Sequence, residues 1–130
     1  MRQPNQGFKI PKFFTQLLNH LYEAECRARK CQDGDKVVRN IERMKDVFLE
    51  DFESLNPGNI GTGLIYEDPM GQVYDDTRND LDAHIAGTST ENLVVVDVIK
   101  PVIRVVNQQQ GISHVVQKGI VTVESLKQGE

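Results

Sequence analysis

The sequence of 130 residues contains no tryptophan and only two cysteines, and its aromatic residues amount to 6%. Hydrophobic residues reach 38%, which is below the usual fraction of a globular domain. We therefore expect a core of modest size. Association of subunits would bury additional apolar surface. No apolar run approaches the length of a membrane-spanning helix, and no signal peptide is visible at the start. The sequence predicts a protein without a membrane partner.

A basic surface and a complete cysteine metal site are also missing. The net charge of −4 argues against nucleic acid as a partner, since such binding needs a basic face. Cys26 and Cys31 have the spacing C-x4-C, and no second cysteine pair exists to complete a zinc site. We expect both thiols to be reduced in a cytoplasmic protein, without a metal or another cofactor.

No pattern of catalytic residues stands out either. Ser113 and His114 are adjacent, so on a strand they would point to opposite faces and could not form a nucleophile–base pair. The histidine nearest to Cys26 in the sequence is His20, and this pair does not indicate an activated thiol. We interpret His84 as a structural histidine, on a short helix that faces the strands. The prediction is that the protein is not an enzyme.

A carboxylate-rich segment offers the remaining chemical alternative. Hard metal ions prefer oxygen ligands of this kind. However, the sixth loop position after Asp75 is Asp80, where a calcium-binding EF-hand loop needs glycine. A solvated acidic loop is the better interpretation, and a metal-dependent hydrolase ranks last among the hypotheses. The segment contains Glu67, Asp68, Asp75, Asp76, Asp80, Asp82 and His84.

Helical periodicity dominates residues 13–56. After a flexible start over residues 1–12, Pro11 opens a pattern of apolar residues at three- and four-residue steps, and Asp35 is a plausible N-cap for a second helix. Two helices joined by a short polar loop form an antiparallel hairpin, which cannot hide its whole apolar stripe alone. We expect a homodimer through this hairpin. Its predicted interface residues are Leu17, Leu21, Ile41, Met44, Phe48 and Phe52.

Residues 57–92 form a predicted connecting region, and residues 93–126 a small β domain. Within the connecting region "GLIY" and "QVY" could be small strands, and "TRNDLDAHIAG" has weak helical character. The later segments "VIKPVIRVV" and "VVQKGIVTV" are rich in β-branched residues, and Pro101 and Gly119 interrupt them. The predicted fold class is α+β: an N-terminal antiparallel helical hairpin followed by a small, mostly antiparallel β domain.

Pro101 and Gly119 mark strand corners, because proline removes a ladder donor and glycine permits a bulge or bend. A corner also projects from a domain. It can therefore present its flanking polar residues to a partner, in this case Lys100, Arg104, Gln117 and Lys118.

The chain resembles GrpE, the nucleotide exchange factor of DnaK-type chaperones, over roughly residues 13 to 125. The predicted hairpin is similar to the paired short helices of GrpE, without the long N-terminal helix of that family. "GQVYDDTRNDLDAHIAG" resembles the Gly-x-x-Phe-Asp element followed by His: Tyr74 replaces the Phe, Asp75 matches, and His84 comes later. "NLVVVDVIKPVIR" and "HVVQKGIVTVE" resemble the strands that open and close the β domain of the family.

The resemblance implies a cochaperone that releases ADP from a DnaK-type chaperone by protein–protein binding. The implied contact residues are Lys100, Pro101, Arg104, Gln117, Lys118 and Gly119, with Tyr74 and Asp75 anchoring the connection to the helices. Gln117 stands where the family has an Arg. The alternative function is a non-enzymatic adaptor of a larger assembly, with the same dimerisation hairpin and β module.

Overall fold

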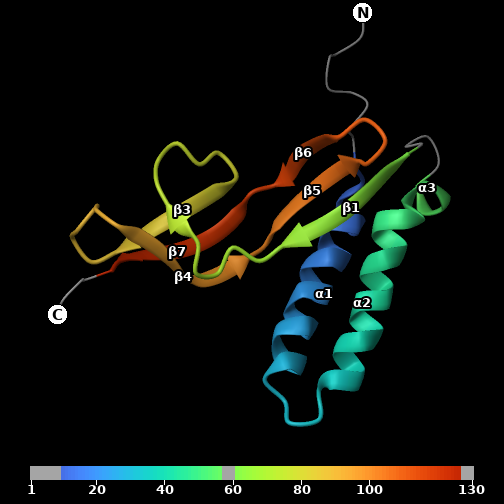
Figure 1. Cartoon of the computed structure of the whole chain (residues 1–130), viewed down its shortest axis with the longest axis horizontal. Helices are drawn as coiled ribbons and strands as arrows, with labels where there is room; N and C mark the ends of the chain where they lie inside the picture. Colours follow the sequence, from blue (N-terminus) through green and yellow to red (C-terminus); the bar gives the residue numbers. More distant parts are fainter. Residues whose placement is uncertain (1–9, 57–60, 127–130) are drawn as a thin grey trace, which may run out of the picture. The chain divides into compact units, whose positions relative to one another are not determined.

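The computed structural model describes residues 10–56 and 61–126 (Figure 1). The α+β fold class is confirmed, since an N-terminal helical hairpin is followed by mainly antiparallel sheets. Most of the predicted flexible start lies outside the described residues, and Pro11 directly precedes the first helix. The helices are α1 (Lys12–Arg29), α2 (Asp35–Glu50) and α3 (Phe52–Leu55). The strands are β1 (Thr62–Glu67), β2 (Val73–Tyr74), β3 (Leu81–Ala86), β4 (Leu93–Lys100), β5 (Val102–Asn107), β6 (Ile112–Gln117) and β7 (Gly119–Ser125).

The chain folds into two compact units whose boundaries differ from the predicted domains. Residues 1–66 and 103–116 form the first, here called the hairpin unit, and residues 67–102 and 117–130 form the second, called the sheet unit. The hairpin unit holds the three helices and a sheet of order β1-β5-β6, whereas the sheet unit holds a sheet of order β2-β4-β7-β3. The predicted β domain is thus divided, because β5 and β6 belong to the same sheet as β1 from the predicted connecting region.

Aromatic and aliphatic side chains of the helices form the core of the hairpin unit together with its sheet. The ring of Phe14 lies edge-on to that of Phe52, with centroids 5.0 Å apart. Helix α2 passes so close to β1 that a Cβ atom on Gly63 would lie 2.1 Å from the carbonyl oxygen of Leu49. Asp35 is the first residue of α2 and not its cap. The buried apolar residues of this unit are Phe14, Leu18, Tyr22, Ala28, Ile41, Phe48, Phe52, Leu64, Tyr66, Ile103 and Val105.

The sheet unit is built around β7, which lies between a parallel and an antiparallel neighbour. β3 pairs with β7 in parallel and in unbroken register, from Leu81 opposite Gly119 to Ala86 opposite Glu124. β4 pairs with β7 antiparallel, with two register shifts. On the core side of this sheet the buried residues are Leu81, Leu93, Val95, Val121 and Val123.

Three segments of the predicted connecting region are strands. "GLIY" lies in β1, and Val73 and Tyr74 of "QVY" form β2, as the sequence suggested. The weak helical character assigned to "TRNDLDAHIAG" is wrong, because residues 81–86 form β3. Pairing with β7 gives this segment its backbone partners, and its apolar and polar residues alternate as in a strand. Within the described ranges, no helix is both long and apolar enough to cross a membrane.

Candidate protein-contact sites

The two look-alike segments are interrupted at Pro101 and Lys118, where a strand of one sheet ends and a strand of the other sheet begins. Pro101 separates β4 from β5, and Lys118 separates β6 from β7. The side-chain amide of Gln117 donates to the carbonyl oxygen of Pro101 at 3.0 Å. A Cβ atom on Gly119 would lie 2.9 Å from Cδ2 of Leu81 and 3.3 Å from the carbonyl oxygen of Lys100. The structure therefore brings five of the predicted contact residues together at one corner of the sheet unit.

Only part of this corner is available to a partner. Pro101 and Gly119 are buried, so they shape the corner and do not form its surface. Lys100 and Lys118 are exposed. The Nζ atom of Lys118 lies 3.8 Å from a carboxylate oxygen of Asp82, an exposed pair that contributes little to stability. The two lysines are the parts of the corner that can contact another protein.

The remaining predicted contact residues lie elsewhere. Arg104 is on β5 and belongs to the hairpin unit. Tyr74 pairs with Leu93 between β2 and β4. The carboxylate of Asp75 accepts hydrogen bonds from the hydroxyl and the backbone N–H of Thr77, and these bonds lower the pKa of Asp75. Asp75 thus stabilises its own turn.

An open apolar groove runs along the outer side of the helical hairpin. Phe13 is 55% exposed, Leu17 49%, and Met44 and Val47 each 45%, all high values for side chains of this kind. Among the described residues that line the groove, His20 is the one that is titratable. The groove is lined by Phe13, Phe14, Leu17, His20, Leu21, Met44, Val47, Phe48 and Leu55.

The predicted dimer residues divide between this groove and the core. Leu17, Leu21, Met44 and Phe48 line the groove. Ile41 and Phe52 are 2% and 0% exposed, because they pack inside the hairpin unit itself. The prediction did not include the groove residues Phe13 and Val47. Spacings of four residues from Phe13 to Leu17 and of three from Met44 to Val47 were the available signal.

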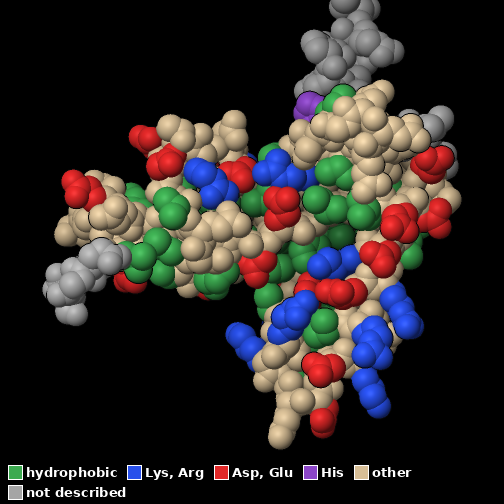
Figure 2. Space-filling view, viewed as in Figure 1, with side chains coloured by type: hydrophobic (Ala, Val, Ile, Leu, Met, Phe, Trp, Pro, Cys, Tyr) green, Lys and Arg blue, Asp and Glu red, His purple; other side chains and the backbone are tan. Residues whose placement is uncertain are grey.

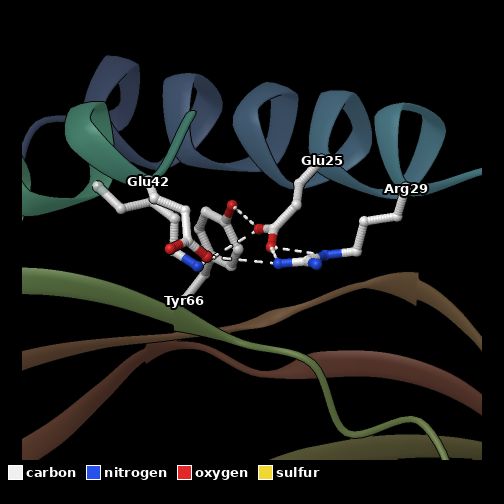
Figure 3. A network of polar contacts seen from close by, with 5 residues as sticks. Glu25, Arg29, Glu42 and Tyr66 are labelled. Atoms are coloured by element: carbon white, nitrogen blue, oxygen red, sulfur yellow. Dashed lines mark hydrogen bonds and ion pairs between the residues drawn. The ribbon is translucent and has the colours of Figure 1, made fainter. Parts of the chain in front are cut away.

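A polar cluster beneath the hairpin was not predicted from the sequence. The hydroxyl of Tyr66 on β1 donates to the carboxylate of Glu25 on α1 at 2.5 Å (Figure 3). Arg29 donates to the same carboxylate from both Nε and Nη2, and Lys45 of α2 donates to it at 3.3 Å. Arg29 also donates to the carboxylate of Glu42 at 3.3 Å. The cluster therefore ties both helices of the hairpin to β1.

Charge and burial act against each other at Glu25, which is 8% exposed. Burial alone would raise its pKa, but the hydrogen bonds from Tyr66 and Arg29 and the charge of Lys45 outweigh burial and lower the pKa below its ordinary value. Burial and the bond to the Glu25 carboxylate both raise the pKa of Tyr66. Each charged or polar side chain of the cluster has a hydrogen-bond or ion-pair partner, so we assign the cluster a structural role.

The described residues include no group of three or more metal-ligating side chains at one place. Ser113 and His114 lie on β6, where consecutive side chains point to opposite faces. His84 lies on β3 and not on the short helix that we predicted. Cys26 and Cys31 are free thiols. Comparisons with protein-family models, curated proteins and solved structures find nothing that matches this chain.

Proposed function

We propose that the protein is a GrpE-like cochaperone, which binds a DnaK-type chaperone and promotes the release of ADP. The observation that carries the proposal is the corner of the sheet unit. Lys100 and Lys118, which come from separate and look-alike segments, are exposed beside buried Pro101 and Gly119. A rigid corner with two exposed cations suits contact with an acidic or polar surface of another protein.

The mechanism is a shift of population in the partner, without chemistry on the cochaperone. A chaperone domain that exchanges between a closed and an open state moves toward the open state when a protein binds that state more tightly. A change from 1% to 99% open needs about a 10⁴-fold preference for the open state. In this proposal the corner makes contacts that only the open state of the nucleotide-binding domain can accept.

The outer groove of the hairpin supports the second part of the proposal, a homodimer. Contiguous exposed apolar surface on a soluble domain marks an interaction site, and two copies of the hairpin would cover each other's groove. The proposal also includes the cytoplasm as the compartment, which fits the two free thiols.

The decisive experiment measures the release of fluorescently labelled ADP from a DnaK-type chaperone of the same organism. We expect the protein to accelerate release, and we expect Lys100→Glu with Lys118→Glu to reduce the acceleration at least tenfold at a fixed subsaturating concentration. The matched control is Lys36→Glu with Arg39→Glu, the same charge change on exposed residues of α2. No acceleration at saturating protein would sink the proposal.

One observation favours the alternative, a non-enzymatic adaptor. The side-chain amide of Gln117, which stands in place of the family's Arg, is hydrogen-bonded to Pro101. A corner held by this bond could bind a different protein through the same two lysines. A crosslinking experiment from position 118 separates the two functions, since only the cochaperone function predicts a chaperone as the crosslinked partner.

A further inference from the structure

Strand β3 lies at the edge of the four-stranded sheet, and no described strand pairs with its outer side. The strand order ends with β3, and in the described part of the chain no strand lies beyond it. Its pairing with β7 is unbroken over six residues, without a bulge, and the strand contains no proline. Natural sheets usually blunt such an edge with one of those devices.

The backbone of β3 offers hydrogen-bonding groups at regular positions along this edge. The N–H of Gly119 donates to the carbonyl oxygen of Asp80 at 2.9 Å, so the backbone of residue 80 points toward β7. In a parallel ladder the backbone groups of successive residues alternate between the two sides. Those of Leu81, Ala83 and Ile85 consequently point to the open edge.

The side chains of β3 are complementary to a second copy of the same strand. Asp82 and His84 are exposed on one face of the sheet. Leu81, Ala83 and Ile85 belong to the other face, and Ile85 is 43% exposed although the Val123 opposite it on β7 is fully buried. The edge thus has an acid and a base on one face and uncovered apolar surface on the other.

We propose that β3 is a self-association site, at which a second copy of this chain adds its own β3 antiparallel about a two-fold axis at Ala83. In this register Ala83 lies opposite Ala83 of the second copy, and Leu81 lies opposite Ile85. Asp82 lies opposite His84, which donates an N–H to a carboxylate in either of its protonation states. The two four-stranded sheets become one continuous sheet.

Neighbouring registers are less favourable for the same side chains. An axis at His84 places two histidines opposite each other, and an axis at Asp82 places two carboxylates opposite each other, which is destabilising. An axis between two residues places core-facing side chains opposite exposed ones. Only the axis at Ala83 pairs Asp82 with His84 twice and also covers Ile85.

This contact uses a different surface from the proposed hairpin dimer, although Asp82 of β3 also lies 3.8 Å from Lys118 of the corner. It uses the sheet unit, whereas the apolar groove belongs to the hairpin unit. The test is therefore made in two backgrounds. Both carry Cys26→Ser and Cys31→Ser, and one of them also carries Leu17→Glu to remove association through the groove.

Single cysteines on β3 report the register directly. With oxidised glutathione as the electron acceptor, we expect Ala83→Cys to give a covalent dimer in both backgrounds. Asp82→Cys and His84→Cys should not crosslink alone, but a mixture of the two proteins should, because those positions face each other. Thr122→Cys on β7 is the control and should give no covalent dimer under the same conditions. Equal yields at all positions, or none at Ala83, would overturn the proposal.

A charge exchange provides a second measurement that does not depend on disulfide geometry. Asp82→Lys should weaken self-association at least fivefold in sedimentation velocity, and Asp82→Lys with His84→Asp should restore it. Glu124→Lys makes the same charge change on β7, away from the edge, and should leave it unaltered. Failure of the double variant to restore association contradicts the proposed register. The proposed function is tested separately, by the Lys100 and Lys118 variants in the ADP-release assay.

Discussion

Glu25 is the residue at which the two helices of the hairpin and β1 share a polar contact. Its carboxylate accepts from Tyr66, Arg29 and Lys45, and these contacts hold its pKa below the ordinary value. A carboxyl group with a lowered pKa in the folded state contributes stability above its unfolded pKa. That contribution is lost as the pH falls below about 4.5, toward the folded pKa.

Replacement of Glu25 by Gln should therefore destabilise the protein at neutral pH by about 1–3 kcal/mol, since buried partners lose a charged acceptor. Urea unfolding measures the difference, and Tyr66→Phe tests the other end of the bond between Tyr66 and Glu25. The gap between wild type and Glu25→Gln should narrow as the pH is lowered from about 5 to about 3. A gap that is constant over this range would contradict the role of the carboxylate charge.

Gly63 tests how closely α2 packs on β1. An alanine there would place Cβ 2.1 Å from the carbonyl oxygen of Leu49, so helix and strand must separate. We expect Gly63→Ala to cost about 2–3 kcal/mol in thermal or urea unfolding, as overpacked core positions do. Gly71→Ala is the control, because that position has a φ of 82° but open space around it, and its cost should be only about 1 kcal/mol. Equal costs would show that the close approach is relieved without strain.

At the scale of the element, the apolar groove of the hairpin yields a prediction about association. Leu17 is 49% exposed and lines the groove, so Leu17→Glu should raise the dimer dissociation constant at least tenfold and change the melting temperature of the monomer little. Gln16→Glu introduces the same charge on the neighbouring exposed position outside the groove and serves as the control. Analytical ultracentrifugation distinguishes them, and equal masses for both variants would remove the case for a hairpin dimer.

Some helices and strands could be predicted from the sequence better than others. Both long helices followed from apolar spacing, because that spacing reflects the face that each helix buries. The spacing could not separate the face toward the sheet from the face toward the groove, so Ile41 and Phe52 were grouped with Met44. Strand β3 was missed because its short apolar–polar alternation depends on β7, some forty residues later in the chain, for backbone partners.

At the scale of the whole molecule, the sequence indicated where strands are interrupted but not how the chain divides. Pro101 lies between β4 and β5, which follows from its local backbone chemistry, whereas Gly119 is the first residue of β7 and the interruption lies at Lys118. The sequence could not indicate that β5 and β6 belong with β1, because sheet membership depends on contacts between distant segments. The Glu25 cluster was missed for the same reason, since Tyr66 lies 41 residues after Glu25.

Charge is distributed unequally between the two units. Among the described residues the sheet unit has nine acidic and three basic side chains, whereas the hairpin unit has nine of each. Figure 2 shows mainly acidic charges over the four-stranded sheet and both signs over the helices. Repulsion among like charges opposes compactness and is screened by salt, whose Debye length falls from about 30 Å at 0.01 M to about 3 Å at 1 M.

We therefore expect salt to stabilise the sheet unit selectively. Raising sodium chloride from about 0.01 M to about 0.5 M should increase the opening free energy of amides in β4 and β7 by roughly 0.5–1 kcal/mol, because exposed charges each contribute only modestly. Amides of α1 and α2 should change less, since the charges of their unit balance. Native-state hydrogen exchange measures both units in one sample. An equal rise in both would mean that salt acts through apolar burial, because screening of charge repulsion would stabilise only the unit with the acidic excess.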